Sequence, residues 1–283
     1  MKIKWKQDGK APMKIREKEG VTYLAYDSFE ETGLVSHGFS TRLGGVSKGI
    51  FSSMNLSFNR GDERTAVHEN YRRIAKALDV NVMKMVASDQ THTTNVRLVT
   101  EEDCAKGILR EKDYRDVDGL ITNIPGITLV TFYADCVPLF FLDPVHKAIG
   151  LSHSGWRGTV HKMGKVTLEE MKKHFGTDPK DVIAGIGPSI CQDCYEVSED
   201  VAMEFAAVFP KNEILKEGKI SEEGQKYQLN LWRANELVLL EAGIKSEHIS
   251  YPGICTCCNP DFLFSHRASK GKRGNLGAFL TLK

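Results

Sequence analysis

Three β-rich runs in the middle of the sequence constrain its fold most. Residues 127–133 and 137–142 are rich in β-branched and aromatic side chains, and residues 147–152 form a third run. The segment Asp143-Pro-Val-His146 predicts a tight turn between the second and third runs. Elsewhere, strand patterns alternate unevenly with helical ones, which favours an α+β fold with mixed β-sheets over a doubly wound parallel sheet. No Gly-x-Gly-x-x-Gly motif opens a βα unit, so a dinucleotide-binding fold has little support.

Helical patterns surround these runs. Apolar spacings of three and four, together with capping residues, predict helices that follow Asp62, cover residues 160–175, run from Ser198 to Pro210 and run from Asn230 to Gly243. Shorter strands are expected over residues 20–26, 81–87 and 182–186. The sequence has no low-complexity tract, Pro- or Ser-rich linker or clear repeat, so residues 1–283 are expected to form a single domain.

Charge and hydropathy exclude some classes of function. The chain has 38 Lys and Arg against 37 Asp and Glu, a formal charge of +1, which argues against bulk nucleic-acid binding. No apolar run approaches the roughly twenty residues of a membrane span, and no signal peptide is visible. We therefore expect a protein of a bacterial-type cytoplasm, without a membrane partner. Seven cysteines without an export signal are expected to be thiols or metal ligands rather than disulfides.

One cysteine and two histidines stand beside predicted strand ends. His92 lies in the segment Gln90-Thr-His92, Cys136 follows Asp135 after a strand, and His153 ends another strand. Thiolate and imidazole are ligands of zinc and copper, and they also form the pair of a cysteine nucleophile and its base. Their spacing matches no short metal-binding motif, so they gain meaning only where the fold brings them together. If the three side chains lie together, they form either a zinc site with an open coordination position or a metal-free thiolate beside an imidazole. Both arrangements predict an enzyme.

Several other polar residues are candidates for a binding cleft. The strand-to-helix turn Ser154-Gly-Trp-Arg-Gly158 places Gly155 and Arg157 where backbone N–H groups and a guanidinium could bind an anion. Its alternative is an ordinary turn with a surface arginine. Further cleft candidates, whose alternative is turn chemistry or solvated surface, are Arg42, Asn55, Asp116, Asp118 and His266-Arg267.

The remaining cysteines have two interpretations. Cys191-Gln-Asp-Cys194 and Cys255-Thr-Cys257-Cys258 resemble half-sites of a structural zinc cluster. We favour free thiols packed near the main pocket over such a second zinc site. Cys104 is expected to have no special role.

With these residues considered, the chain resembles the YfiH/YlmD family, whose members have been labelled laccase-domain or multicopper polyphenol oxidases and later purine nucleoside phosphorylases. Two small departures, Ser154 for alanine and His266 for tyrosine, leave the presumed ligands untouched. The motifs that carry the resemblance occur in order over nearly the whole chain and include His37-Gly-Phe-Ser-Thr-Arg-Leu-Gly-Gly45, Val67-His-Glu-Asn-Tyr-Arg72, Gln90-Thr-His92, Asp116-Val-Asp-Gly-Leu120, Ala134-Asp-Cys136, His153-Ser-Gly-Trp-Arg-Gly158 and Phe264-Ser-His-Arg267.

The resemblance implies a layered α/β/β/α fold with mixed sheets, similar in outline to cysteine-hydrolase-like toxin domains. It implies that His92, Cys136 and His153 bind zinc, with copper as an alternative ion. The implied reactions are phosphorolysis of adenosine, inosine, guanosine and methylthioadenosine, and deamination of adenosine, by a monomer or homodimer. Arg42, Asn55, Gly155 and Arg157 are then candidates for substrate or phosphate binding, and Asp135 or Asp118 for a proton shuttle.

Two other activities stay open at this point. A copper-dependent phenol oxidase is the family's older label, but the chain has nine histidines and no His-x-His pair, which suits a multicopper site poorly. A metal-free cysteine hydrolase acting on peptidoglycan-type amides is the second alternative. A non-enzymatic binding module has the least support, because it does not require a thiolate and two imidazoles at strand ends.

Overall fold

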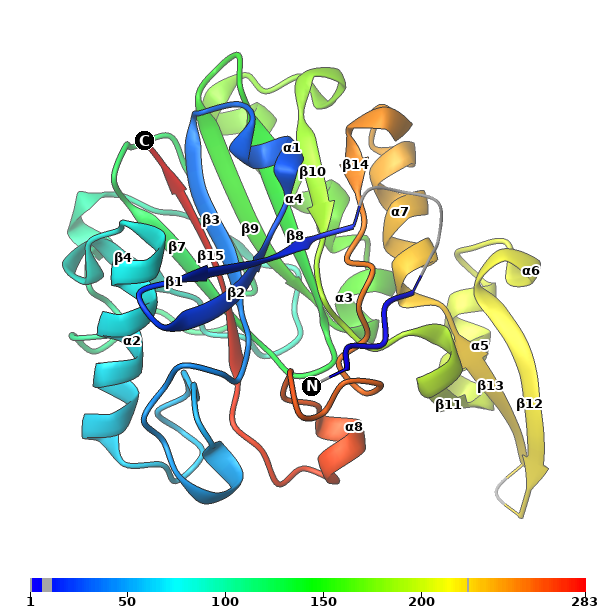
Figure 1. Cartoon of the computed structure of the whole chain (residues 1–283). Coiled ribbons are helices and arrows are strands. Elements are labelled where there is room, and N and C mark those ends of the chain that lie inside the picture. Colours follow the sequence, from blue (N-terminus) through cyan, green and yellow to red (C-terminus); the bar gives the residue numbers. More distant parts are fainter. Residues whose placement is uncertain (1, 7–11, 223) are drawn as a thin grey trace.

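The computed structural model describes residues 2–6, 12–222 and 224–283. Two six-stranded mixed sheets form its centre (Figure 1). The first sheet has the order β1 (Lys14–Lys18), β2 (Val21–Ala25), β3 (Val35–Ser40), β15 (Leu276–Leu282), β7 (Thr128–Tyr133) and β4 (Met85–Ala87). The second sheet has the order β14 (Ile249–Ser250), β10 (Ile183–Ile186), β8 (Val137–Asp143), β9 (Ala148–Ser154), β6 (Gly119–Thr122) and β5 (Val96–Leu98). Most neighbours are antiparallel, while β4–β7, β5–β6 and β10–β14 are parallel.

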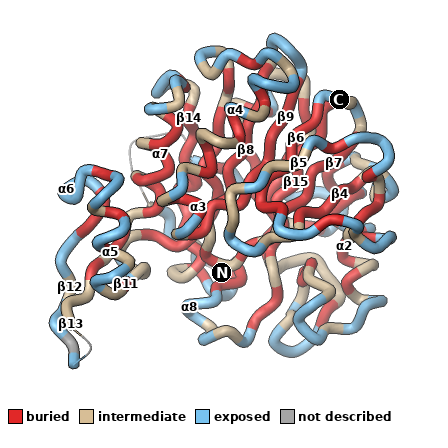
Figure 2. The backbone as a smooth tube through the Cα atoms, turned by 180° about the vertical axis from the view of Figure 1, so that it is seen from behind, coloured by how far each residue is buried: buried red, intermediate tan, exposed pale blue. Residues whose placement is uncertain are grey.

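The apolar alternation along β8 shows how the layers are built. Val137, Leu139 and Phe141 face a cluster beneath the helices. Phe140 and Leu142 face the opposite cluster, which lies between the two sheets. A strand that is buried on both faces needs a continuous apolar run rather than alternation with polar residues, and residues 137–142 provide one. In Figure 2 the central strands are accordingly buried along most of their length.

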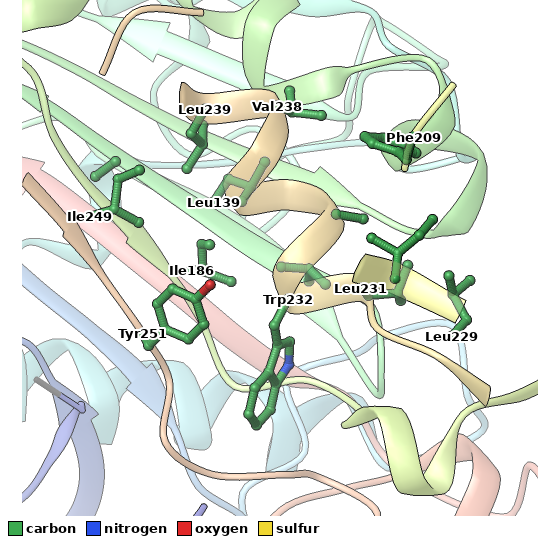
Figure 3. Packing of buried hydrophobic residues seen from close by; sticks show 14 of the residues in the cluster. Leu139, Ile186, Phe209, Leu229, Leu231, Trp232, Val238, Leu239, Ile249 and Tyr251 are labelled. Carbon is green, nitrogen blue, oxygen red and sulfur yellow. The ribbon is translucent and has the colours of Figure 1, made fainter. Parts of the chain in front are cut away.

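Helices cover the outer face of each sheet. Helix α2 (Arg64–Leu78) packs Val67, Tyr71 and Ile74 against the first sheet. Helices α4 (Met163–Phe175) and α7 (Leu231–Glu241) cover the second sheet, and Figure 3 shows Val238 and Leu239 of α7 packed beside Leu139. The α+β class and the layered α/β/β/α arrangement are therefore confirmed. The short helices are α1 (Asp27–Glu30), α3 (Trp156–Val160), α5 (Glu199–Ala206), α6 (Lys211–Ile214) and α8 (His266–Ser269).

A three-stranded sheet projects to one side of these layers (Figure 1). It has the order β11 (Glu196–Ser198), β13 (Gly224–Leu229) and β12 (Leu215–Ser221). Val197, Tyr227 and Leu229 belong to the same apolar cluster as the residues beneath α7. This shared cluster joins the projecting sheet to the rest of the molecule, and the expectation of one domain over residues 1–283 stays a prediction.

Some local expectations were wrong. Helix α2 begins at Arg64 with Glu63 as its N-cap, because the Asp62 carboxylate instead accepts hydrogen bonds from Ser47 and Asn55. Residues 160–175 do not form one helix, since Lys162 adopts φ 57° and separates α3 from α4.

Of the other residues expected to begin or end a helix or strand, some do so and others do not. The expected strand over 81–87 is shortened to β4, because Asn81 caps a 3-10 turn at Val82–Lys84. Pro210 begins α6 instead of ending α5. Asn230 does cap α7, where its side chain accepts the Arg233 N–H at 3.0 Å. None of the helices in the described parts of the chain is long and apolar enough to cross a bilayer.

Candidate metal centre

The chain passes from one large sheet to the other at residues 134–136. Strand β7 ends in the first sheet, and β8 begins in the second only a few residues later. Asp135 takes φ 91° in this link, so the chain turns sharply and leaves Cys136 where the two sheets meet. The neighbouring strand β9 pairs with β8 so that His153 lies opposite Pro138.

His92, Cys136 and His153 converge at this point. One ligand atom of each lies within 4.8 Å of those of the other two. The Cys136 Sγ atom is 3.9 Å from Nε2 of His92, and the two imidazole rings lie 5.0 Å apart in an edge-on arrangement. His153 is buried, Cys136 is half-buried and His92 is exposed, so the group is accessible from one side. The sequence-based expectation that these three distant residues come together is met by this geometry.

Asp118 orients both histidines. Its Oδ1 atom accepts a hydrogen bond from Nδ1 of His153 at 2.8 Å, which leaves Nε2 of that ring for a ligand. The carboxylate also accepts the backbone N–H groups of Thr91, His92 and Thr93 at 2.9–3.1 Å. His92 has φ 68°, and these bonds stabilise the loop in that left-handed conformation. One buried carboxylate thus fixes the position of two of the three candidate ligands.

Gly155 leaves the space that the ligands occupy. A Cβ atom at this position would lie 2.8 Å from Cδ2 of His92 and 3.2 Å from the sulfur of Cys136. Any side chain would therefore push the imidazole away from the thiol. Gly155 thus borders the candidate site and provides space for it, while its expected role in anion binding stays a prediction.

The electrostatics of the pair favour a thiolate. Burial on its own raises the pKa of Cys136, but the charge of His153 and hydrogen bonds from both histidines outweigh it and lower the pKa to about 6. Burial lowers the pKa of His153, while the Cys136 thiolate and Asp118 outweigh it and raise the pKa to about 9. A cation is favourable beside this sulfur, as a protonated imidazole or as a metal ion.

The residues fit a zinc ion. One sulfur and two imidazole nitrogens are a donor set that zinc prefers, and three protein ligands leave the fourth tetrahedral position free. The second nitrogen of His153 is bound by a carboxylate, as is usual for a metal-ligating histidine. The donor set alone does not separate zinc from copper.

A cavity of about 770 Å³ reaches the candidate metal centre, and His92, Cys136 and His153 are part of its lining. Its wall is markedly cationic, a feature that the sequence reasoning missed. The basic side chains in the lining are Arg60, Arg64, Arg110, Lys112, Arg115 and Arg273. They come from segments far apart in the sequence, and no motif in any one segment signals the others.

Arg273 differs from the other cations because it is buried, with 9% of its surface exposed. Burial and the neighbouring charge of Arg60 lower its pKa to about 10. Its Nε atom has no hydrogen-bond partner among the described residues. A desolvated guanidinium with a spare donor is suited to an anionic ligand.

All four residues predicted to bind substrate or phosphate lie outside the lining of this cavity, and the positions of three of them follow. Arg42 donates hydrogen bonds to the backbone carbonyls of Ser52 and Pro260, at 2.9 and 2.5 Å, and lies over the Phe264 ring. Asn55 is fully buried, and its side chain closes a turn with Ser57.

Arg157 is exposed and stacks on Trp156, 4.3 Å from the ring centroid. These contacts favour structural or surface roles for the three residues.

The chain matches known proteins over most of its length. The family model described as multi-copper polyphenol oxidoreductase laccase matches residues 36–283. Purine nucleoside phosphorylase YlmD of Bacillus subtilis (strain 168) is 36% identical over 250 residues, which are 87% of this chain and 88% of that protein. Adenosine deaminase RL5, from an unknown prokaryotic organism, is 34% identical over 232 residues, covering 81% of this chain and 87% of that protein.

Solved structures agree with these matches. The crystal structure of YlmD from Geobacillus stearothermophilus has a TM-score of 0.86 and 32% identity, and the match covers 96% of this chain and 100% of that one. The crystal structure of the hypothetical protein YfiH of Bacillus licheniformis has a TM-score of 0.87 and 31% identity, over 95% and 99% of the two chains. The sequence motifs, the layered fold and these matches together show that the chain belongs to the laccase-like family of the YfiH and YlmD proteins.

Proposed function

We propose that this enzyme is a zinc-dependent purine nucleoside phosphorylase that acts on adenosine, inosine, guanosine and methylthioadenosine. The observation that carries the proposal is the shared cavity. The His92, Cys136 and His153 group lines it together with the buried Arg273, whose Nε atom has no hydrogen-bond partner among the described residues. Relatives named purine nucleoside phosphorylase support the same reaction. The reaction joins phosphate to C1′ of the ribose, breaks the C1′–N9 bond and releases the purine, which takes up a proton.

The cavity wall suits both substrates. Arg273, with Arg60 close enough to affect its pKa, provides positive charge for phosphate. Phe58 and Phe132 in the same lining offer aromatic surface for a purine. A volume of about 770 Å³ lies within the usual range for small-molecule sites.

Zinc bound by His92, Cys136 and His153 would supply a Lewis acid with one open coordination position. The chain itself contributes orientation at this point. Asp118 fixes the His153 ring, and its several hydrogen bonds favour a positioning role over the proton shuttle expected from the sequence. Asp135 is similarly engaged, because Oδ1 accepts from Thr256 at 2.6 Å and Oδ2 from the Arg267 N–H at 2.7 Å.

Adenosine deamination is proposed as a second activity. A relative named adenosine deaminase supports it, and the exposed side of the metal group, at His92, would admit both a water molecule and the purine ring. The reaction replaces the 6-amino group by a carbonyl oxygen from water and releases ammonia. Cytoplasmic location and a monomeric or homodimeric state stay predictions from the sequence.

The decisive experiment incubates the purified protein with adenosine, with and without phosphate. Ribose 1-phosphate that forms only with phosphate is the expected result. Chelation or Cys136→Ala should abolish it together with the metal at the His92, Cys136 and His153 group. Activity that survives chelation would favour a cysteine hydrolase. Copper content with phenol oxidation and no phosphorolysis would favour the oxidase.

A further inference from the structure

Two Cys-x-x-Cys segments meet away from the nucleoside cavity. Cys191 and Cys194 lie in the turn that follows β10, and Cys255 and Cys258 lie in the loop that follows β14. The segments are joined by a backbone hydrogen bond from Thr256 to Ser189 at 3.1 Å. None of the four cysteines is among the residues that line the cavity, and the expectation of free thiols packed near it stays a prediction.

The four sulfur atoms form a compact group. All lie within 4.8 Å of one another, with Cys194 Sγ 3.4 Å and Cys191 Sγ 3.9 Å from Cys258 Sγ. Tetrahedral zinc with Zn–S bonds of about 2.3 Å places its sulfurs about 3.8 Å apart. The separations therefore bracket those of a single tetrahedral ion.

Backbone donors prepare one sulfur for negative charge. The N–H groups of Cys191 and Cys258 donate to Sγ of Cys255, at 3.2 and 3.4 Å. Lys6 adds a cation nearby through a 2.8 Å ion pair with Asp193, which lies between the first two cysteines. Apolar packing of neutral thiols requires neither backbone donors on sulfur nor four sulfurs in mutual contact.

We infer that Cys191, Cys194, Cys255 and Cys258 bind a second zinc ion, which has a structural role. Each thiol would lose its proton to solvent as the ion binds, giving four thiolates around one dication. Four protein ligands leave no open position, which is typical of structural rather than catalytic zinc. Cys191 and Cys255 are buried while Cys194 and Cys258 are half-buried, so the ion would be largely enclosed.

The four-cysteine site lies beside the segments that contact Asp135. Thr256, between two of the ligands, donates from Oγ1 to Oδ1 of Asp135 at 2.6 Å. Ile190, next to Cys191, donates its N–H to the backbone carbonyl of Asp135 at 3.0 Å. The second zinc would thus cross-link the two segments that hold Asp135, the residue preceding Cys136.

Metal content tests this inference without any activity measurement. The full chain, purified under reducing conditions from zinc-containing medium, should hold two zinc ions by elemental analysis and native mass spectrometry. Cys194→Ser should lose one ion, and X-ray absorption of the remaining ion should show one sulfur with nitrogen ligands. Cys136→Ala should lose the other ion and leave a four-sulfur environment.

Cys257→Ser and Cys104→Ser are the matched controls, because both thiols lie outside the group of four. Both variants should keep two ions. Should Cys194→Ser fail to fold, X-ray absorption of the wild type decides, since a single zinc without a four-sulfur component overturns the inference. Iron in place of zinc, or a Cys194–Cys258 disulfide in protein that binds one ion, overturns it as well. Failure of phosphorolysis leaves these readouts unchanged, so the two proposals are tested separately.

Discussion

Asp118 binds the imidazole of His153 and the backbone N–H of His92 with the same carboxylate oxygen, at 2.8 and 3.1 Å. His153 lies in β9, whereas His92 lies in the loop that joins β4 of the first sheet to β5 of the second, and this buried carboxylate relates their positions. A carboxylate that accepts a hydrogen bond from a metal-ligating histidine fixes the orientation of the imidazole ring and increases its basicity.

Asp118→Asn should weaken zinc binding about 10- to 100-fold, because the variant loses the charge and places an amide where three backbone N–H groups donate. Competition with a chromogenic chelator measures the affinity. Asp116→Asn is the control, since Asp116 is exposed and its contact with Thr91 at 2.7 Å survives the change. Equal zinc affinity in the two variants would show that Asp118 does not position the ligands.

Gly155→Ala should lose most of the bound metal at the His92, Cys136 and His153 group while the fold is retained. The added methyl group would lie 2.8 Å from the His92 ring and 3.2 Å from the Cys136 sulfur. Gly158→Ala is the matched control, because its nearest neighbour would be 3.5 Å away. Elemental analysis and circular dichroism of both variants check the prediction, and normal metal content in Gly155→Ala contradicts it.

Arg273→Met should raise the KM for phosphate about 10- to 100-fold, the effect of losing hydrogen bonds to a charged group. The KM for the nucleoside should change less. Arg157→Met is the control, because Arg157 is exposed and stacked on Trp156 outside the cavity lining. Initial rates at varied phosphate measure both constants. A larger rise of the phosphate KM in Arg157→Met than in Arg273→Met would instead support the anion site that the sequence predicts at the turn after His153.

His37 should make folding stability depend on pH. It is buried, its Nε2 accepts the Tyr26 N–H at 2.8 Å, and burial lowers its pKa from 6.5 to about 3. The unfolded chain therefore binds a proton that the folded chain rejects, so His37 stabilises the fold fully above pH 6.5 and progressively less as the pH falls toward 3. The loss is roughly 2 kcal/mol at pH 5 and roughly 5 kcal/mol in total.

His37→Gln keeps an acceptor for the Tyr26 N–H and removes the titration. Urea unfolding of both proteins at pH 7 and pH 5 gives the two slopes, and the other titrating groups are common to both. The variant should lose less unfolding free energy between these pH values than the wild type. Parallel losses in the two proteins would show that His37 is not the cause.

Local patterns predicted much of the secondary structure. The β-rich run of residues 137–142 predicted a strand, and β8 is that strand. Asn230 and Gly243 predicted the two ends of α7, because capping depends on neighbours within one turn. Asp62 failed as a cap for a non-local reason, since Ser47 and Asn55 bind its carboxylate.

The sequence by itself determined the layered class of fold and, through its family motifs, the identity of His92, Cys136 and His153 as candidate ligands. Only the tertiary structure decided that Arg273 lies buried at their cavity and that Asp118 orients two histidines. It also decided that the sulfur atoms of four other cysteines lie within 4.8 Å of one another. The physical reason is the sequence distance over which each kind of interaction acts. Strand and helix signals arise from neighbouring residues, whereas a site is formed by side chains from separate strands, and the packing of two sheets sets their distances.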